Sequence, residues 1–205
     1  MTAFLVALLA YFLGSVPVGL LVSRWAKGID IREHGSGNIG TTNVLRTIGI
    51  GWAALVFAID AAKGALPVLF GQSLGVSPGG LAVAAFLAVA GHNWSIFLRF
   101  RGGKGVATTL GALAALAPLA AVGAAMVWVF VVLVSGYASL GSMTGLAATG
   151  PLLALLGTPR EFVWLGLALA AVAVYQHRAN IGRLVQGKEL RILPRSKSSV
   201  PDRNQ

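Results

Sequence analysis

Cysteine is absent from this chain of 205 residues, and charged residues are scarce. Without cysteine the chain has neither disulfide bonds nor cysteine metal sites. Its three histidines, His34, His92 and His177, are far apart and lack the spacing of zinc ligands, so we expect no metal and no other cofactor. Charged residues make up 11% of the chain, whereas a soluble domain has about 25%. This shortage excludes an ordinary soluble domain.

Acidic residues are the scarcer charge, with six Asp and Glu against sixteen Lys and Arg, a net charge of +10. Such an excess occurs in nucleic-acid-binding proteins, but basic residues also collect on the cytoplasmic side of membrane proteins, where they meet anionic lipid. Because 56% of the residues are hydrophobic, the second explanation is the better one. We therefore predict a polytopic all-α membrane protein whose partner is membrane lipid and not nucleic acid.

Long apolar stretches alternate with basic loops along the chain. Three stretches are long enough to cross about 30 Å of hydrocarbon, and they cover residues 1–23, 51–72 and 81–98. Pro17 is expected to kink the first of them. The remaining apolar sequence is cut into four pieces, of which the first two are short for a crossing: 106–117, 120–134, 138–156 and 161–176.

The basic residues set the expected topology. Arg24, Lys27 and Arg32 follow the first span and no Lys or Arg precedes it, so we expect the N-terminus outside and the C-terminus in the cytoplasm. Lys104 and the basic tail then both lie inside, which requires an even number of crossings between them. We predict about seven transmembrane helices, two of them short, in a single domain of residues 1–205. Five spans with re-entrant pieces is the alternative, and residues from about 194 to 205 are expected to form a mobile basic tail.

The first of three polar clusters covers residues 34–46 and joins the first two spans. Its glycines match G-x-G-x-x-G, but a dinucleotide site needs a preceding strand, and here an apolar helix precedes it. The glycines instead free the backbone to close on a ligand, and Arg46 offers a planar fork for phosphate. The candidate ligand-binding residues of this cluster are Ser36, Gly37, Asn38, Thr41, Thr42, Asn43 and Arg46.

The second cluster is the glycine-rich turn of residues 99–109, with Lys104 at its centre. A turn of this kind is expected to expose backbone N–H groups and an ammonium at the start of a helix, which favours an anion. It is not a nucleotide-triphosphate loop, because glycine follows Lys104 where that motif has Ser or Thr. A phosphate-monoester site remains, and its candidate residues are Gly102, Gly103, Lys104, Gly105 and Thr108.

The third cluster begins where the last apolar piece ends. His177, Asn180 and Arg183 are spaced i, i+3, i+6, so on a continuing helix they share one face and offer a base, an amide and a cation. Glu189 follows close to Arg183 and is expected to form a structural ion pair.

Asp60 and Lys63 are charged residues expected in the middle of an apolar span. Ionised side chains are costly there, so they normally pair or face a polar cavity. Their i, i+3 spacing permits a pair, and we expect it to play a structural role beside the site.

Three motifs, taken together, resemble a known family. G-S-G-N-x-G-x-T-N-x-x-R, F-x-G-G-K-G-x-A-T and H-R-x-N-I-x-R-x-x-x-G-x-E occur in this order between apolar spans, as in the PlsY family of bacterial acyl-phosphate:glycerol-3-phosphate acyltransferases. The resemblance covers essentially the whole chain. It implies a multi-pass protein of the bacterial inner membrane with a cytoplasmic active site, working without metal. It also implies an interaction with the soluble enzyme that makes acyl phosphate.

The resemblance further implies acyl transfer from acyl phosphate to the 1-hydroxyl of sn-glycerol 3-phosphate, which gives lysophosphatidate and phosphate and is the first step of phospholipid synthesis. We assign the 102–105 turn to the phosphate of glycerol 3-phosphate, and Ser36 and Arg46 to the acyl phosphate. Either His177 or an oxygen of the donor phosphate removes the hydroxyl proton, with Asn180 as a binder. The rival hypothesis from another class is a transporter of a phosphorylated small anion.

Overall fold

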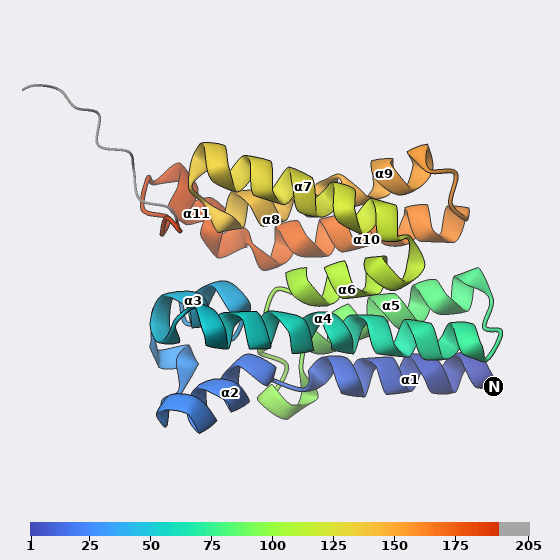
Figure 1. Ribbon diagram of the computed structural model, residues 1–205, viewed down its shortest axis with the longest axis horizontal. Helices are drawn as coiled ribbons and strands as arrows, with labels where there is room; N and C mark the ends of the chain where they lie inside the picture. Colours follow the sequence, from blue (N-terminus) through green and yellow to red (C-terminus); the bar gives the residue numbers. More distant parts are fainter. Residues whose placement is uncertain (193–205) are drawn as a thin grey trace, which may run out of the picture.

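The computed structural model describes residues 1–192, in which all regular structure is helical. The predicted tail of residues 194–205 lies outside the described residues. The helices form two layers, with α1–α6 in one and α7–α10 in the other (Figure 1). Their bounds are α1 (Thr2–Ser15), α2 (Val18–Lys27), α3 (Thr41–Ile48), α4 (Ile50–Ser73), α5 (Pro78–Asn93), α6 (Val106–Leu116), α7 (Pro118–Ser135), α8 (Ala138–Ala147), α9 (Thr149–Leu155), α10 (Arg160–Gln176) and α11 (Arg178–Val185), with 3₁₀ turns η1 (Ile31–Glu33) and η2 (Ile96–Leu98).

The predicted all-α polytopic class is confirmed. Within residues 1–192, five helical segments are long and apolar enough to cross a membrane, and the bent pair α10–α11 makes a sixth. The apolar helix α6 is shorter, as expected for residues 106–117, whereas α7 has 18 residues and reaches the length of a span, which the piece 120–134 did not predict. The N-terminus and α11 lie at opposite ends of the bundle (Figure 1).

The first span is broken at Pro17, as predicted. Proline has no N–H and ends α1, so the carbonyls before it lose their helical donors. In lipid such carbonyls need other partners. Ser95 Oγ donates to the Ser15 carbonyl at 2.5 Å, and Lys63 Nζ donates to the Val16 carbonyl at 2.9 Å. The side chains of other elements therefore complete the hydrogen bonding of the break.

Small residues allow the helices to pack closely. A side chain at Gly64 would overlap the carbonyl of Thr108, which shows how near α4 and α6 approach. The pair Gly141 and Gly145, predicted to serve close packing, faces the backbone of α7, with the carbonyls of Trp128 and Ala124 at 2.9 and 2.8 Å from where a Cβ would stand.

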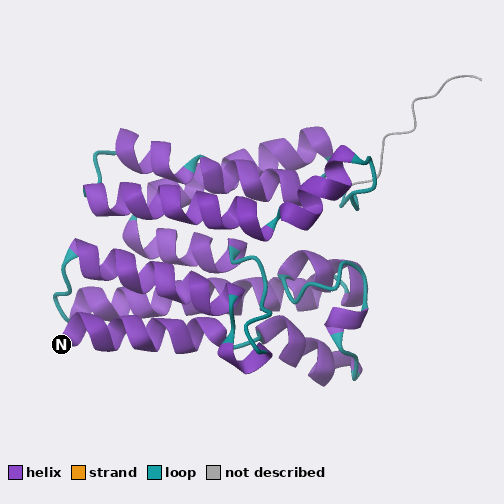
Figure 2. Cartoon of the chain, turned by 180° about the vertical axis from the view of Figure 1, so that it is seen from behind, coloured by secondary structure: helices purple, strands orange, loops and turns teal. Residues whose placement is uncertain are grey.

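The ends of α5 and α6 place the second cluster inside the bundle. α5 stops at Asn93 and α6 starts at Val106, so the connection that contains η2 and the glycine-rich turn folds back between them. The longer loops gather toward the end of the molecule that also holds α2, α3 and α11 (Figures 1 and 2). This arrangement gathers the three polar clusters into one region.

Candidate active site

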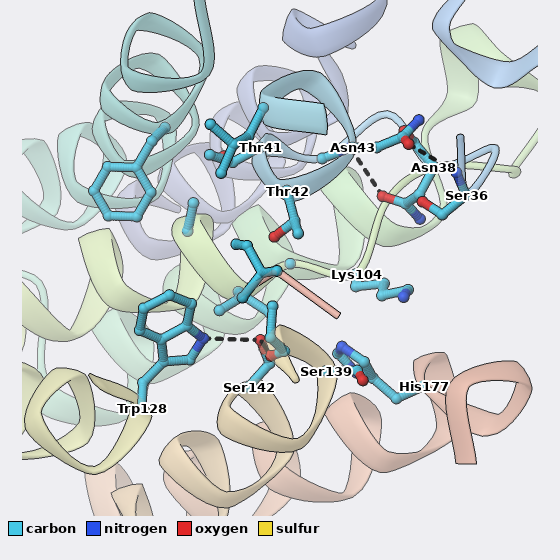
Figure 3. Close-up of a pocket in the computed structure, with 18 of the residues that line it drawn as sticks. Ser36, Asn38, Thr41, Thr42, Asn43, Lys104, Trp128, Ser139, Ser142 and His177 are labelled. Atoms are coloured by element: carbon cyan, nitrogen blue, oxygen red, sulfur yellow. Dashed lines mark hydrogen bonds between the residues drawn. The ribbon is translucent and has the colours of Figure 1, made fainter. Parts of the chain in front are cut away.

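A cavity of about 300 Å³ lies between the two helical layers, where all three clusters meet. It is lined by the loop before α3, the start of α6, the facing sides of α7 and α8, and the region around α11 (Figure 3). The predicted site residues that line it are Ser36, Asn38, Thr41, Thr42, Asn43, Arg46, Lys104, Gly105, His177 and Asn180, together with Asp60 and Glu189. Its other walls are mainly apolar, and they include Leu45, Phe57, Leu110, Ala125 and Val129.

Lys104 is held by the third cluster. Its ammonium donates to Asn180 Oδ1 at 2.5 Å, and Asn180 Nδ2 in turn donates to Glu189 Oε1 at 2.6 Å. Figure 3 shows the Lys104 side chain between the loop that carries Ser36 and the helix end that carries His177. Because both ends of the Asn180 amide are engaged, Asn180 fixes the lysine in the cavity.

Glu189 anchors this chain of hydrogen bonds. Its carboxylate accepts from Ser139 Oγ at 2.8 Å and from Arg183 Nε at 2.7 Å, as well as from Asn180. Burial opposes ionisation of Glu189, but the hydrogen bonds from Asn180, Arg183 and Ser139 outweigh it and hold its pKa below the usual value. The expected ion pair between Glu189 and Arg183 is confirmed.

Asn43 organises the first cluster from within. Its Oδ1 accepts from the Ser36 N–H at 2.8 Å, and its Nδ2 faces the carbonyls of Ile31, His34 and Asn38 at 3.1, 2.9 and 2.9 Å. The amide is therefore engaged in shaping the loop. Asn43 also lines the cavity, so its expected contact with substrate stays a prediction.

Two N–H groups of the glycine-rich turn are already hydrogen-bonded within the protein. Gly102 and Gly103 donate to the carbonyls of Asn93 and His92 at 3.0 and 2.9 Å, so the expected row of free N–H groups is absent at these two residues. Gly105, in the left-handed conformation at φ 76°, starts α6. Gly105, Val106 and Ala107 line the cavity, so the start of α6 presents the positive end of its dipole to a ligand.

Arg46 supplies a second cation. Its Nη2 donates to the Leu190 carbonyl at 2.8 Å, which ties α3 to the segment after α11. Its Nε is buried and has no hydrogen-bond partner among the described residues. A buried donor without a partner is costly, and an anion in the cavity would relieve that cost.

His177 lies at a bend of 58° between α10 and α11, so the helix does not continue as predicted. The bend still leaves His177 and Asn180 on the cavity wall. His177 Nδ1 is 2.8 Å from the Ala173 carbonyl. Since a carbonyl only accepts, Nδ1 carries the proton, and Nε2 of the neutral ring is left with its lone pair.

Comparison with known proteins identifies the family of this chain. A family model described as glycerol-3-phosphate acyltransferase matches residues 4–187. The chain belongs to the glycerol-3-phosphate acyltransferase family. It is 51% identical over 183 residues to a glycerol-3-phosphate acyltransferase of Desulforudis audaxviator, covering 89% of this chain and 92% of that protein. It is 47% identical to glycerol-3-phosphate acyltransferase 2 of Moorella thermoacetica, covering 94% of this chain and 98% of that protein.

Two solved structures of PlsY (YgiH), an integral membrane glycerol 3-phosphate acyltransferase, share the fold. Its glycerol 3-phosphate form superposes with a TM-score of 0.90 at 36% identity, covering 94% of this chain and 96% of that chain. Its lysophosphatidic acid form gives 0.87 at the same identity, covering 93% and 95%. The chain is accordingly a multi-pass membrane acyltransferase of the PlsY family.

Some predicted site residues of this acyltransferase do not line the cavity. They are Gly37, Gly102, Gly103, Thr108 and, of the Asp60–Lys63 pair, Lys63. Thr108 is fully buried in the contact between α6 and α4. The predicted ion pair is confirmed, with Lys63 Nζ 2.7 Å from Asp60 Oδ1.

The acyltransferase cavity also contains polar residues that the sequence did not indicate. Ser139 and Ser142 of α8 line it beside Trp128 of α7, whose Nε1 donates to Ser142 Oγ at 3.2 Å. Ser142 Oγ itself donates to the Ala138 carbonyl at 2.8 Å. No motif marks these serines, because they lie in an apolar, glycine-containing stretch that is typical of helix packing.

The Lys104 ammonium is expected to make acceptor binding depend on pH. Burial lowers the pKa of Lys104 to about 8; nearby Glu189 opposes the shift, and Arg183 and Arg46 add to it. Lysine is cationic below its pKa, and a phosphate monoester is a dianion above about pH 6. We expect kcat/KM for glycerol 3-phosphate to be highest between these values and to fall about tenfold per pH unit above pH 8. Initial rates from pH 5.5 to 10 measure this.

Arginine at the same position is the control for that profile. Because a guanidinium stays charged throughout this range, Lys104→Arg should lose the alkaline fall, whatever its absolute activity. A Lys104→Arg profile with the same fall would assign the titration to another group.

Proposed function

We propose that this protein transfers an acyl group from acyl phosphate to the 1-hydroxyl of sn-glycerol 3-phosphate, releasing lysophosphatidate and inorganic phosphate. The reaction would begin phospholipid synthesis at the cytoplasmic face of a bacterial inner membrane. One observation carries the proposal: a single cavity combines two cations, Lys104 and Arg46, with largely apolar walls. Both substrates carry phosphate and the donor also carries a fatty chain, so the cavity has features suited to both ends.

Lys104 and the start of α6 hold the phosphate of glycerol 3-phosphate in this scheme. The ammonium and the helix dipole both favour an anion, and Thr42 of α3 lines the same cavity. The related PlsY has been solved in a glycerol 3-phosphate form and a lysophosphatidic acid form, which supports an acceptor and a product of this chemistry here.

Arg46 and Ser36 hold the acyl-phosphate end. The unpartnered Nε of Arg46 suits a phosphate or the carbonyl oxygen, and Ser36 and Asn38 add donors from the loop that Asn43 shapes. Donors fixed in advance at a developing oxyanion typically contribute more to the rate than any other single feature of an active site. The fatty chain would run along Phe57 and the other apolar walls.

The acyl carbonyl of the donor is part of a mixed anhydride. The acceptor hydroxyl attacks that carbonyl, the carbon–oxygen bond to phosphate breaks, and phosphate leaves as an anion without a strong acid. The hydroxyl proton passes either to His177 Nε2 or to an oxygen of the donor phosphate. His177 and Asn180 then bind and orient the reactants in both cases.

Turnover of defined donors tests the proposal. The purified protein in detergent or liposomes should convert acyl phosphate and glycerol 3-phosphate to lysophosphatidate and phosphate in equal amounts. Acyl-CoA and acyl carrier protein, offered in parallel, should give no product. Product from acyl-CoA alone would keep the family assignment and refute the donor. The transporter hypothesis is not retained, since the chain belongs to an acyltransferase family.

Replacing Glu189 should weaken both folding and acceptor binding. Glu189→Gln turns one accepting oxygen into a donor that faces Ser139, Asn180 or Arg183, all of which donate. We expect a loss of about 1–3 kcal/mol of stability and a raised KM for glycerol 3-phosphate. Thermal unfolding in detergent and initial rates measure these. Exposed Glu33→Gln is the control, and equal melting temperatures in both variants would contradict the anchoring role.

A further inference from the structure

Three buried ionisable residues, Asp60, Lys63 and His92, have no role in the proposed chemistry, although Asp60 and His92 line the cavity. Asp60 and His92 are 1% and 4% exposed, and Lys63 is also buried. Asp60 Oδ1 is 2.7 Å from Lys63 Nζ and 3.6 Å from His92 Nδ1. Such groups are costly within a membrane span and commonly mark a functional region.

Two backbone carbonyls at the end of α5 hold the glycine-rich turn. Its carbonyl accepts the N–H of Gly103 at 2.9 Å, and the next carbonyl, of Asn93, accepts the N–H of Gly102 at 3.0 Å. The turn therefore follows the position of the end of α5.

The ring of His92 also fills the space beside Gly103. A Cβ at Gly103 would overlap His92 Nε2. Gly103 has no left-handed backbone, so its backbone conformation permits alanine. The imidazole, and not the backbone angle, excludes a side chain there.

Lys104 follows Gly103 directly in the chain, and its ammonium meets Asn180 Oδ1 at 2.5 Å. A shift of Gly103 away from His92 would carry the Lys104 backbone with it. Misplacing a binding group by about 1 Å can cost about a hundredfold in rate.

We propose that His92 is a positioning residue: its ring, which lies next to the Asp60 carboxylate, supports Gly103 and thereby sets the position of the Lys104 ammonium against the phosphate of the acceptor. The inference rests on the proposed role of Lys104 in binding glycerol 3-phosphate. His92 acts through the turn, and its loss should raise KM for the acceptor more than it lowers kcat.

A compensating pair of substitutions tests the contact. Gly103→Ala should raise KM for glycerol 3-phosphate at least about tenfold, because the new methyl group displaces the turn. Gly103→Ala combined with His92→Ala should recover at least about threefold of that loss, since the methyl group then enters the space of the ring. Gly102→Ala is the matched control: its Cβ would overlap the backbone carbonyl of His92, so His92→Ala should not rescue it.

Independent effects of the substitutions at positions 92 and 103 would overturn the proposal. If the rise in KM for glycerol 3-phosphate in the Gly103→Ala/His92→Ala protein equals the product of the rises in the two single variants, His92 does not support Gly103. The same conclusion follows if His92→Ala lowers the KM of Gly102→Ala by the same factor. A variant too unstable to assay is replaced by His92→Gln and His92→Ala in the wild-type turn. His92→Gln retains a polar group of similar reach and should keep KM nearer to wild type than His92→Ala, and the reverse order refutes the proposal.

The dissociation constant of glycerol 3-phosphate, measured calorimetrically without donor, separates two failures. Wild-type protein that does not bind glycerol 3-phosphate contradicts the proposed function itself. Wild-type binding with no coupling between positions 92 and 103 contradicts only the role of His92.

The role of Asp60 is tested by replacing it together with its ion-pair partner Lys63. Asp60→Asn/Lys63→Gln removes both charges, so neither is left buried alone. This change should raise KM for glycerol 3-phosphate at least about threefold in the wild type and less than about twofold in the His92→Ala background. An equal rise in both backgrounds would show that Asp60 does not act through His92.

Discussion

Replacing Lys104 with methionine is expected to raise KM for glycerol 3-phosphate by about a hundredfold. A hydrogen bond to a charged group is worth about 1.5–3 kcal/mol, and each 1.4 kcal/mol is about tenfold in affinity. Methionine keeps the apolar length of the side chain but leaves the phosphate without its cation and Asn180 Oδ1 without its donor. Initial rates over a wide range of acceptor concentration, at saturating acyl phosphate, measure the change.

Lys188→Met is the matched control for this experiment. Lys188 is exposed, lies beyond α11 and does not line the cavity, so its loss should leave KM within about twofold, as is usual for an exposed charge. If Lys104→Met has the KM of the wild type, the phosphate of glycerol 3-phosphate binds elsewhere and the assignment of the turn is wrong.

Replacing His177 with asparagine should lower kcat by about a hundredfold, the smaller end of general-base contributions. Asparagine retains an N–H close to the position of Nδ1, which faces the Ala173 carbonyl at 2.8 Å, and removes Nε2. The fold around the bend should therefore survive. Single-turnover rates at saturating substrates report the chemical step.

His177→Gln complements this variant, because its longer amide reaches toward the position of Nε2. It should be more active than His177→Asn, since an accepting oxygen there still orients the hydroxyl. His177→Asn with wild-type turnover would dismiss His177 as the base and leave the proton to an oxygen of the donor phosphate.

The sequence was sufficient for the class of fold and for the three clusters. Hydrophobic runs and basic loops marked the membrane spans, since lipid imposes its length on a helix. The pair Asp60–Lys63 and the pair Arg183–Glu189 were predicted because charges in apolar or crowded surroundings need partners. Both pairs are present, at 2.7 Å.

Features that depend on packing were beyond the sequence. Gly102 and Gly103 were expected to present N–H groups to a ligand, but they approach His92 so closely that their N–H groups are already used. The role of Asn43 in shaping its loop was not predicted, because it depends on backbone groups that surround its amide only in the folded loop. Ser142 enters the cavity only because α7 and α8 pack closely, and no local pattern predicts that contact.

The break at Pro17 bears on how the bundle assembles. The Ser15 carbonyl accepts from Ser95, and the Val16 carbonyl accepts from Lys63 as well as from the nearby Val18 N–H. Ser95 and Lys63 belong to parts of the chain made later. In lipid, an unsatisfied carbonyl costs several kcal/mol, so the first span alone has little reason to adopt this geometry at insertion. The break is therefore a product of tertiary assembly: it becomes stable when α4 and the end of α5 arrive beside α1.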